Sequence, residues 1–429
     1  MGQKIENELR LALSKVVREV QEHQFSSHPD YARYALMHNP FPPAGVADVP
    51  EPLVQLPEAI SRFGQFFQLT YGGERYGGLT IVGDYGMGKT HWLRYFEHAV
   101  NELAESYASE RPLAIYVENP GKSPRDIVHR IIETIGQERI SRYLWGFVKD
   151  TLAERIPKEP QAFVGDKKMV LPLLPDTISR EGVSINFKGF LDTFIKSGGD
   201  LQKLADETRG IVDRELCGHP GVASKFVSLL FEPFAAATKT WNSLVGLTST
   251  REFERKEAIL LRSVIHLLRN EGYRHLYILL DEFEDIANKA ISVARRQEYF
   301  SALRILLDRD LRHRSIIIAM TDQALTMLKQ EAPALHDRIW QFHFTLKPLD
   351  GRTAQEFVSE YTRVARVENP PAGISSIFPF SEQLVEKLRM QAGSNIRQFL
   401  TECRRALELA KEQKSDPPLG EEVLDIAGD

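Results

Sequence analysis

Short apolar runs recur along the chain, separated by long stretches with helical spacing. Five runs read as strands: LTIV (79–82), LAIYV (113–117), LYILL (276–280), SIIIAM (315–320) and WQFHFTL (340–346). Strands that are apolar on both faces are typical of sheets buried on both sides. Because helical stretches connect the runs, the pattern predicts an α/β fold with a parallel sheet between layers of helices.

The second and third runs are separated by an unusually long interval, about residues 140–260. Much of it has helical spacing, as in FVSLLFEPFAAATKTWNSLVGL (226–247). Connections inside compact domains are usually much shorter, so this interval indicates an inserted helical subdomain. The predicted core, including this insertion, spans 58–350, and a second helical region, 351–412, follows it.

The two ends of the chain have weaker patterns. Residues 1–57 begin with an amphipathic stretch whose Ile5, Leu9 and Leu13 lie near one face. They continue into NPFPPAGVADVPEPLVQLP (39–57), which we expect to form an extended arm, because proline is excluded from helix interiors and central strands. Residues 413–429 are predicted to be a flexible acidic tail.

The composition is that of an ordinary soluble protein, with 42% hydrophobic and 26% charged residues. The net charge of −5 gives no overall positive field toward nucleic acid. Only two cysteines are present, Cys217 and Cys403, so a disulfide framework is not expected. No apolar run approaches the ~18 residues of a membrane span. We therefore expect a cytoplasmic protein without a membrane segment.

The sequence GDYGMGKT (83–90) satisfies the pattern G-x-x-x-x-G-K-[ST], follows the first predicted strand and opens a helix. Glycines let such a loop wrap a phosphate chain, with backbone N–H groups pointing inward. Lys89 would reach the β- and γ-phosphates, and the Thr90 hydroxyl would ligate Mg²⁺. We therefore predict an ATP site with Mg²⁺. The residues expected to contact the nucleotide are Gly83, Asp84, Tyr85, Gly86, Met87, Gly88, Lys89, Thr90 and His91.

A second chemical motif ends the third strand, where LYILL is followed by Asp281 and Glu282. Ligands of open α/β sheets bind at this carboxyl edge. Asp281 is predicted to hold Mg²⁺ through water, and Glu282 to orient or deprotonate the attacking water. Glu284 and Asp285 continue the acidic run, and we expect them to form a solvated helix start.

Thr321 closes the fourth strand, in SIIIAMTDQ. Its hydroxyl is predicted to lie between the two earlier motifs, near the γ-phosphate. The alternative is that Thr321 or Asp322 caps the helix that starts with QALTMLKQ.

The P-loop, the acid-terminated strand and the polar end of the next strand resemble, in that order, the AAA+ ATPases. The resemblance implies a P-loop NTPase with a five-stranded sheet in the order 5-1-4-3-2 and a helical lid at 351–412. It also implies hydrolysis of ATP to ADP and phosphate, with nucleotide at the interface of a homo-oligomer.

Two arginines match further AAA+ positions. DRIWQFHFTLKPLD (337–350) resembles the segment that supplies an arginine finger to the neighbouring subunit, which implicates Arg338. AGSNIRQFL (392–400) resembles the lid signature and implicates Arg397 as second sensor, although one residue is inserted between Gly393 and Asn395. The alternative for each arginine is a surface or salt-bridged side chain.

Within AAA+, the chain resembles the origin-recognition-like branch. NPF (39–41) and ENPGKSPRDIVHRIIETIG (118–136) are similar to the bacterial ExeA and TnsC group. ILLRSVIHLLRNEGYRHLYILLDEFEDI (259–286) and RRQEYFSALRILLD (295–308) resemble phage-defence-island ATPases such as BrxD of BREX systems. The resemblance does not extend to the insertion.

This branch implies that the target is double-stranded DNA or a DNA-processing complex. Initiator relatives carry a winged helix after the lid, and 413–429 is too short for one. DNA contact is therefore expected from the insertion or from loops lining a ring. The basic clusters are Arg295 and Arg296, and Arg309, Arg312 and Arg314, for which the alternative is a solvated face.

Two hypotheses about function follow. The first is an ATP-hydrolysing oligomer that acts on DNA, in phage defence or mobile-element biology. The second is a nucleotide-gated scaffold with little turnover that recruits an effector protein through the insertion. A P-loop kinase is disfavoured by the order of the motifs. Zinc at Cys217 and His219 is disfavoured because no second ligand pair follows. Trp145 and Trp241 are expected in a core or partner surface.

Overall fold

The computed structural model describes residues 29–42, 56–73, 77–121, 124–164, 186–245, 253–286, 291–308, 313–393 and 395–424. Its centre is a parallel sheet of five strands: β1 (Gly78–Val82), β2 (Arg111–Val117), β3 (Tyr273–Leu280), β4 (Arg314–Met320) and β5 (Phe342–Thr345). The strand order is β2-β3-β4-β1-β5. Counted from the other edge this is 5-1-4-3-2, so the predicted sheet is confirmed.

Both faces of the sheet are buried, which explains why the strands are apolar without alternation. In β3, Leu276, Ile278 and Leu280 pack into one hydrophobic core, whereas Tyr277 and Leu279 pack into the other. The second core lies under α2 (Leu56–Tyr71) and α3 (Lys89–Glu105). The first lies under α4 (Pro124–Ile135), α11 (Phe253–Asn270), α12 (Val293–Asp308), α13 (Asp322–Glu331) and α14 (Pro333–Ile339).

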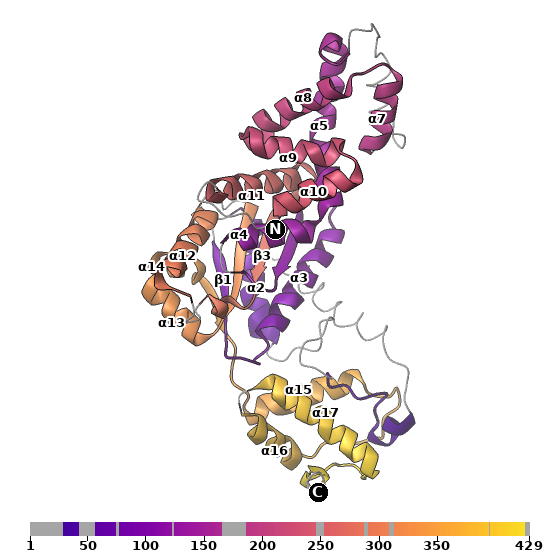
Figure 1. Ribbon diagram of the computed structural model, residues 1–429. Coiled ribbons are helices and arrows are strands. Elements are labelled where there is room, and N and C mark those ends of the chain that lie inside the picture. The colour runs from indigo at the N-terminus through magenta and orange to yellow at the C-terminus, as the bar shows by residue number, and fades with distance from the viewer. Residues whose placement is uncertain are drawn as a thin grey trace.

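Helices fill the long interval between β2 and β3. They are α5 (Gln137–Lys158), α7 (Phe187–Lys196), α8 (Leu201–Ile211), α9 (Pro220–Phe231) and α10 (Phe234–Val245), with a π-helical turn, η3 (Val212–Cys217). Figure 1 shows this insertion extending away from the sheet along α5. Trp145 on α5 is buried, with its ring centroid 4.7 Å from that of Phe190 on α7. The core role expected for this tryptophan is confirmed, and the insertion has an apolar interior continuous with that of the sheet.

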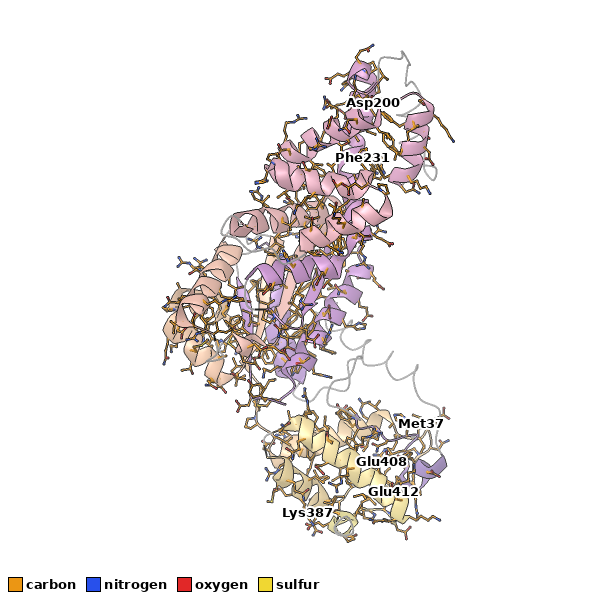
Figure 2. The ribbon with its side chains drawn as sticks, in the orientation of Figure 1. Met37, Asp200, Phe231, Lys387, Glu408 and Glu412 are labelled. Carbon is orange, nitrogen blue, oxygen red and sulfur yellow. The ribbon has the colours of Figure 1, made fainter. Side chains whose placement is uncertain are left out.

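The region predicted to be the lid consists of α15 (Gly351–Val364), α16 (Glu382–Ala392) and α17 (Ile396–Gln413), with a hydrophobic core of its own. Residues 29–42 pack on it, including the 3₁₀ turn η1 (Pro29–Tyr34). The ring of Phe41 is stacked 5.5 Å from Tyr361 and meets the edge of Phe380 at 5.6 Å. In Figure 2, Met37 accordingly lies in the same part of the molecule as Glu408 of α17, although the two residues are far apart in the sequence.

Residues 414–424 also fold onto the lid, so the expectation of a loose tail is wrong for them. Leu419 exchanges backbone hydrogen bonds with Ser381 and Pro379, and its side chain is fully buried. Arg33 pairs with Asp416 at 2.7 Å. The tail is acidic on average, but Leu419 and Val423 supply the apolar contacts that hold it. The predicted N-terminal helix, residues 43–55 of the arm, and residues 425–429 lie outside the described residues.

No helix in the described part of the chain has the length and apolar character needed to cross a membrane.

Candidate nucleotide-binding site

The loop 83–88 joins β1 to α3 at the carboxyl edge of the sheet. Two of its glycines have positive φ, Gly86 at 76° and Gly88 at 92°, a region that other residues rarely adopt. Gly88 is the N-cap of α3 and has no side chain with which to cap it. The first N–H groups of the helix therefore face the loop, which is the arrangement that binds phosphate. The geometry is that of a P-loop, and the chain has an α/β P-loop NTPase fold.

Lys89, the first residue of α3, is buried with its amino group inside the loop. Its Nζ donates to the carbonyl oxygens of Gly83 (2.9 Å) and Asp84 (3.2 Å). It also lies 3.3 Å from Oε1 of Glu284, and both side chains are only 8% exposed. This contact overturns the expectation of a solvated Glu284. The reason is tertiary: the turn after β3 folds against the loop after β1, which spacing along the chain does not reveal.

Asp281 directly follows β3, and the residue is only 2% exposed. Its carboxylate accepts hydrogen bonds from Tyr116 Oη (2.8 Å) and the Glu282 backbone N–H (2.9 Å). Since β4 alone separates β3 from β1, Asp281 and the P-loop share one edge of the sheet. Thr90 lies in the first turn of α3, which begins at that same edge.

These oxygen donors fit Mg²⁺. The ion is usually held by one or two carboxylates together with water and substrate phosphates. Asp281 and Thr90 offer a carboxylate and a hydroxyl of that kind. Among the described residues no group of three or more His, Cys, Asp or Glu could hold a metal. A magnesium ion at this edge would therefore depend on water and phosphates for the rest of its ligands.

Glu282 is exposed and has a left-handed backbone (φ 49°), unlike the buried Asp281 beside it. Desolvation, followed by the negative charges of Asp285 and Asp281, raises the pKa of its carboxyl above the ordinary value. A raised pKa makes a carboxylate a better proton acceptor near neutral pH. The two carboxylates thus have distinct environments: that of Asp281 suits a metal ligand, and that of Glu282 suits a general base.

Thr321 follows β4, between the P-loop and Asp281, and is buried. Its Oγ1 accepts a hydrogen bond from the Ala324 N–H at 3.2 Å, which makes it the N-cap of α13. The capping alternative is therefore confirmed, and a contact with the γ-phosphate stays a prediction.

The lid meets the P-loop through the start of α17. The Arg397 N–H donates to the Gly86 carbonyl at 3.0 Å. Asn395 caps the helix by accepting from the Gln398 N–H at 3.0 Å. The Arg397 side chain is exposed, so α17 places it beside the loop without burying it.

Arg338 lies near the amino ends of the strands, opposite the ends that carry the P-loop. It is on α14, and a Cβ on Gly77, just before β1, would lie 3.4 Å from its carbonyl oxygen. Strand β1 spans five residues, or roughly 16 Å. Arg338 is therefore far from the P-loop of its own chain, and a role at a nucleotide would require a second copy.

Tyr116 and Asn119 are site residues that sequence reasoning missed. The Asn119 Nδ2 donates to Asp285 Oδ2 at 3.0 Å and lies 3.5 Å from Glu282 Oε2. Both residues lie at or just after the carboxyl end of β2. Their position at the ligand-binding edge was the signal that could have identified them.

Two of the suggested basic positions are structural. Arg314 is buried in β4, and Arg296 is buried in a bidentate pair with Glu331 at 2.6 and 2.9 Å. Arg309 and Arg312 lie outside the described residues, and Arg295 is exposed.

A zinc site at Cys217 was disfavoured from the sequence. Burial raises the pKa of the Cys217 thiol to about 11, which disfavours the thiolate that zinc requires.

No protein-family model matches the chain. No curated protein matches it either. Similar solved structures include two of the ORC2 protein of Aeropyrum pernix. The structure of its ADPNP–ADP complexes is 13% identical with a TM-score of 0.43, covering 89% of this chain and 69% of that one. The ADP form is 12% identical with a TM-score of 0.45, covering 89% and 70%. The likeness is distant.

Proposed function

We propose that this protein binds ATP with Mg²⁺ and hydrolyses it to ADP and phosphate. The carrying observation is that a P-loop with a buried Lys89 shares one sheet edge with Asp281 and Glu282. In this assignment Lys89 binds the phosphates, and Thr90 and Asp281 hold the metal. When bound there, Mg²⁺ would supply positive charge that offsets the charge of the phosphates.

The chemical step is assigned to Glu282. Its pKa is raised, it is exposed directly after Asp281, and Asn119 Nδ2 lies 3.5 Å from its Oε2. Its carboxylate would accept a proton from the water that attacks the γ-phosphorus, as the bond to the β-γ bridging oxygen breaks. Thr321 and Arg397 would contact the terminal phosphate from β4 and from the lid.

We place the active site between two copies of the chain. Arg338 is remote from its own P-loop, so its assignment as an arginine finger rests on a neighbouring subunit. The target we propose is duplex DNA or a DNA-processing complex, in phage defence or mobile-element biology. That part rests on the sequence resemblance, with the insertion α5–α10 as the surface for DNA or an effector protein.

The test is steady-state hydrolysis of Mg·ATP by the purified chain, with and without duplex DNA. Glu282→Gln should bind ATP but lose at least ~100-fold in kcat, the scale of a general base. Lys89→Ala should lose binding. Glu133→Gln, an exposed acid on α4, is the matched control and should behave like the unaltered protein.

Each outcome separates the hypotheses. If the unaltered protein turned over ATP no faster than Glu282→Gln but still formed ATP-dependent oligomers, the nucleotide-gated scaffold would be the better hypothesis. Turnover that duplex DNA leaves unchanged would contradict DNA as the target.

A further inference from the structure

The ammonium of Lys89 already has a full set of acceptors in the protein. Its three N–H donors face the carbonyl oxygens of Gly83 and Asp84 and the carboxylate of Glu284. In the assignment above, the β- and γ-phosphates need donors from this same group. The two carbonyls belong to the loop itself, so Glu284 is the acceptor that phosphate would replace.

The other oxygen of Glu284 is in an unfavourable position. Oε2 is buried and has no hydrogen-bond partner. A buried acceptor without a donor destabilises a fold, because its desolvation is not compensated by a hydrogen bond. The carboxylates of Glu282 and Asp285 add negative charge nearby. Both of them, like Glu284, contribute to raising the pKa of the neighbouring Tyr85 hydroxyl, for which desolvation is the largest cause. Glu284 is thus a poorly satisfied anion held mainly by Lys89.

This arrangement is unusual for a purely structural pair. Buried ion pairs stabilise folds only when their remaining lone pairs are also satisfied. Here one carboxylate oxygen is bonded and the other is not. The pair is therefore suited to being broken when a better anion arrives.

We propose that Glu284 is an intramolecular competitor for the phosphate site. Its carboxylate holds Lys89 when the site is empty, gives the ammonium up as phosphates enter, and reclaims it as product leaves. It thereby sets nucleotide affinity and speeds ADP release. This inference rests on the proposed function, because it takes nucleotide as the ligand. Glu284 is a positioning residue that acts through Lys89 and does not touch the reacting atoms.

The experiment measures equilibrium binding and dissociation of fluorescent ADP and a non-hydrolysable ATP analogue. Glu284→Gln keeps the shape of the side chain and removes its charge. We expect both nucleotides to bind about tenfold more tightly, the scale of one charge-assisted hydrogen bond, mainly through slower dissociation. If ADP release limits turnover, kcat should fall while KM falls with it.

Asp285→Asn is the matched control. It removes an equal charge one residue away, on an exposed carboxylate that contacts Asn119 and not Lys89. Its affinity should change less than about threefold, as expected for a screened charge. Glu284→Ala should act in the same direction as Glu284→Gln, and melting curves without nucleotide verify that each variant is folded.

Three results would overturn the inference. Weaker binding by Glu284→Gln would mean that Glu284 supports Lys89 rather than competing for it. Equal tightening by Asp285→Asn would mean simple charge repulsion. Unchanged binding would mean that Lys89 is free to bind phosphate with Glu284 in place. If the unaltered protein and both Glu284 variants bound no nucleotide, the proposed function would fail as well.

Discussion

The backbone N–H of Arg397 donates a hydrogen bond of 3.0 Å to the carbonyl of Gly86, in the middle of the P-loop. The lid therefore contacts the loop through main-chain atoms as well as through any side chain that reaches a nucleotide. Residues 29–42 pack on the same lid, so the P-loop and the N-terminal segment contact one helical unit. The contact is made by the first turn of α17, the helix that Asn395 caps.

Gly86→Ala should disrupt this contact and weaken nucleotide binding. The new Cβ would lie 2.1 Å from Asn395 Oδ1, and the residue has a φ of 76°. We expect nucleotide affinity to fall at least ~10-fold, measured by titration, and the free energy of unfolding to fall by about 1–3 kcal/mol.

Gly73→Ala is the control for backbone strain. Gly73 has φ 92°, yet a Cβ there would meet nothing within 4 Å. Its unfolding free energy should fall by about 1 kcal/mol with unchanged nucleotide affinity. Unaltered affinity in Gly86→Ala would show that the lid contact and the loop conformation are unimportant for binding.

Much of this site could be predicted from sequence because its motifs are local. The P-loop and the Asp281–Glu282 pair each occupy a few consecutive residues that follow an apolar strand, and parallel strands bring their carboxyl ends to one edge. The strand order was predicted only through the resemblance to AAA+ ATPases that these motifs carry.

What could not be predicted depends on contacts between distant segments. Glu284 resembles a solvated helix start until β3 and β1 bring it to Lys89. Likewise, nothing in the spacing of Phe41 or Leu419 indicates that both ends of the described chain pack on the lid. Such contacts depend on complementarity between surfaces, which one sequence does not display.

On the acidic side of its pH profile, activity should fall at a higher pH than an ordinary glutamate would give. Glu282 must be ionised to accept a proton, and desolvation with neighbouring carboxylates raises its pKa. Activity should therefore fall as pH drops through that raised value. Asp285→Asn removes one of those charges and should shift the limb of the kcat–pH profile toward lower pH, whereas Glu133→Gln should not. A limb that stays in place in Asp285→Asn would exclude Glu282 as the titrating group.

Phe41→Ala should loosen the N-terminal segment from the lid. The ring is 1% exposed, stacks on Tyr361 and meets Phe380 edge-on. Loss of such a side chain from a core lowers the free energy of unfolding by about 3–5 kcal/mol. Denaturant unfolding measures it, and Phe41→Leu should lower that free energy by less because it refills part of the cavity. Equal, small effects of both variants would mean that residues 29–42 do not contribute to the lid core.

Mixing two inactive variants tests whether Arg338 serves a neighbouring subunit. Arg338→Ala should lose on the order of 10³-fold in kcat, the scale of an arginine finger, and Glu282→Gln is inactive for a different reason. In a mixed oligomer, some interfaces combine an intact Glu282 site with an intact Arg338 from the adjacent copy. Activity should therefore reappear on mixing and depend on the ratio of the two proteins. Arg405→Ala, an exposed arginine on α17, is the control and should be fully active alone. If Arg338 instead supported only its own chain, mixing would restore nothing, because the Glu282→Gln subunits would keep the only competent arginines beside a site that lacks its base.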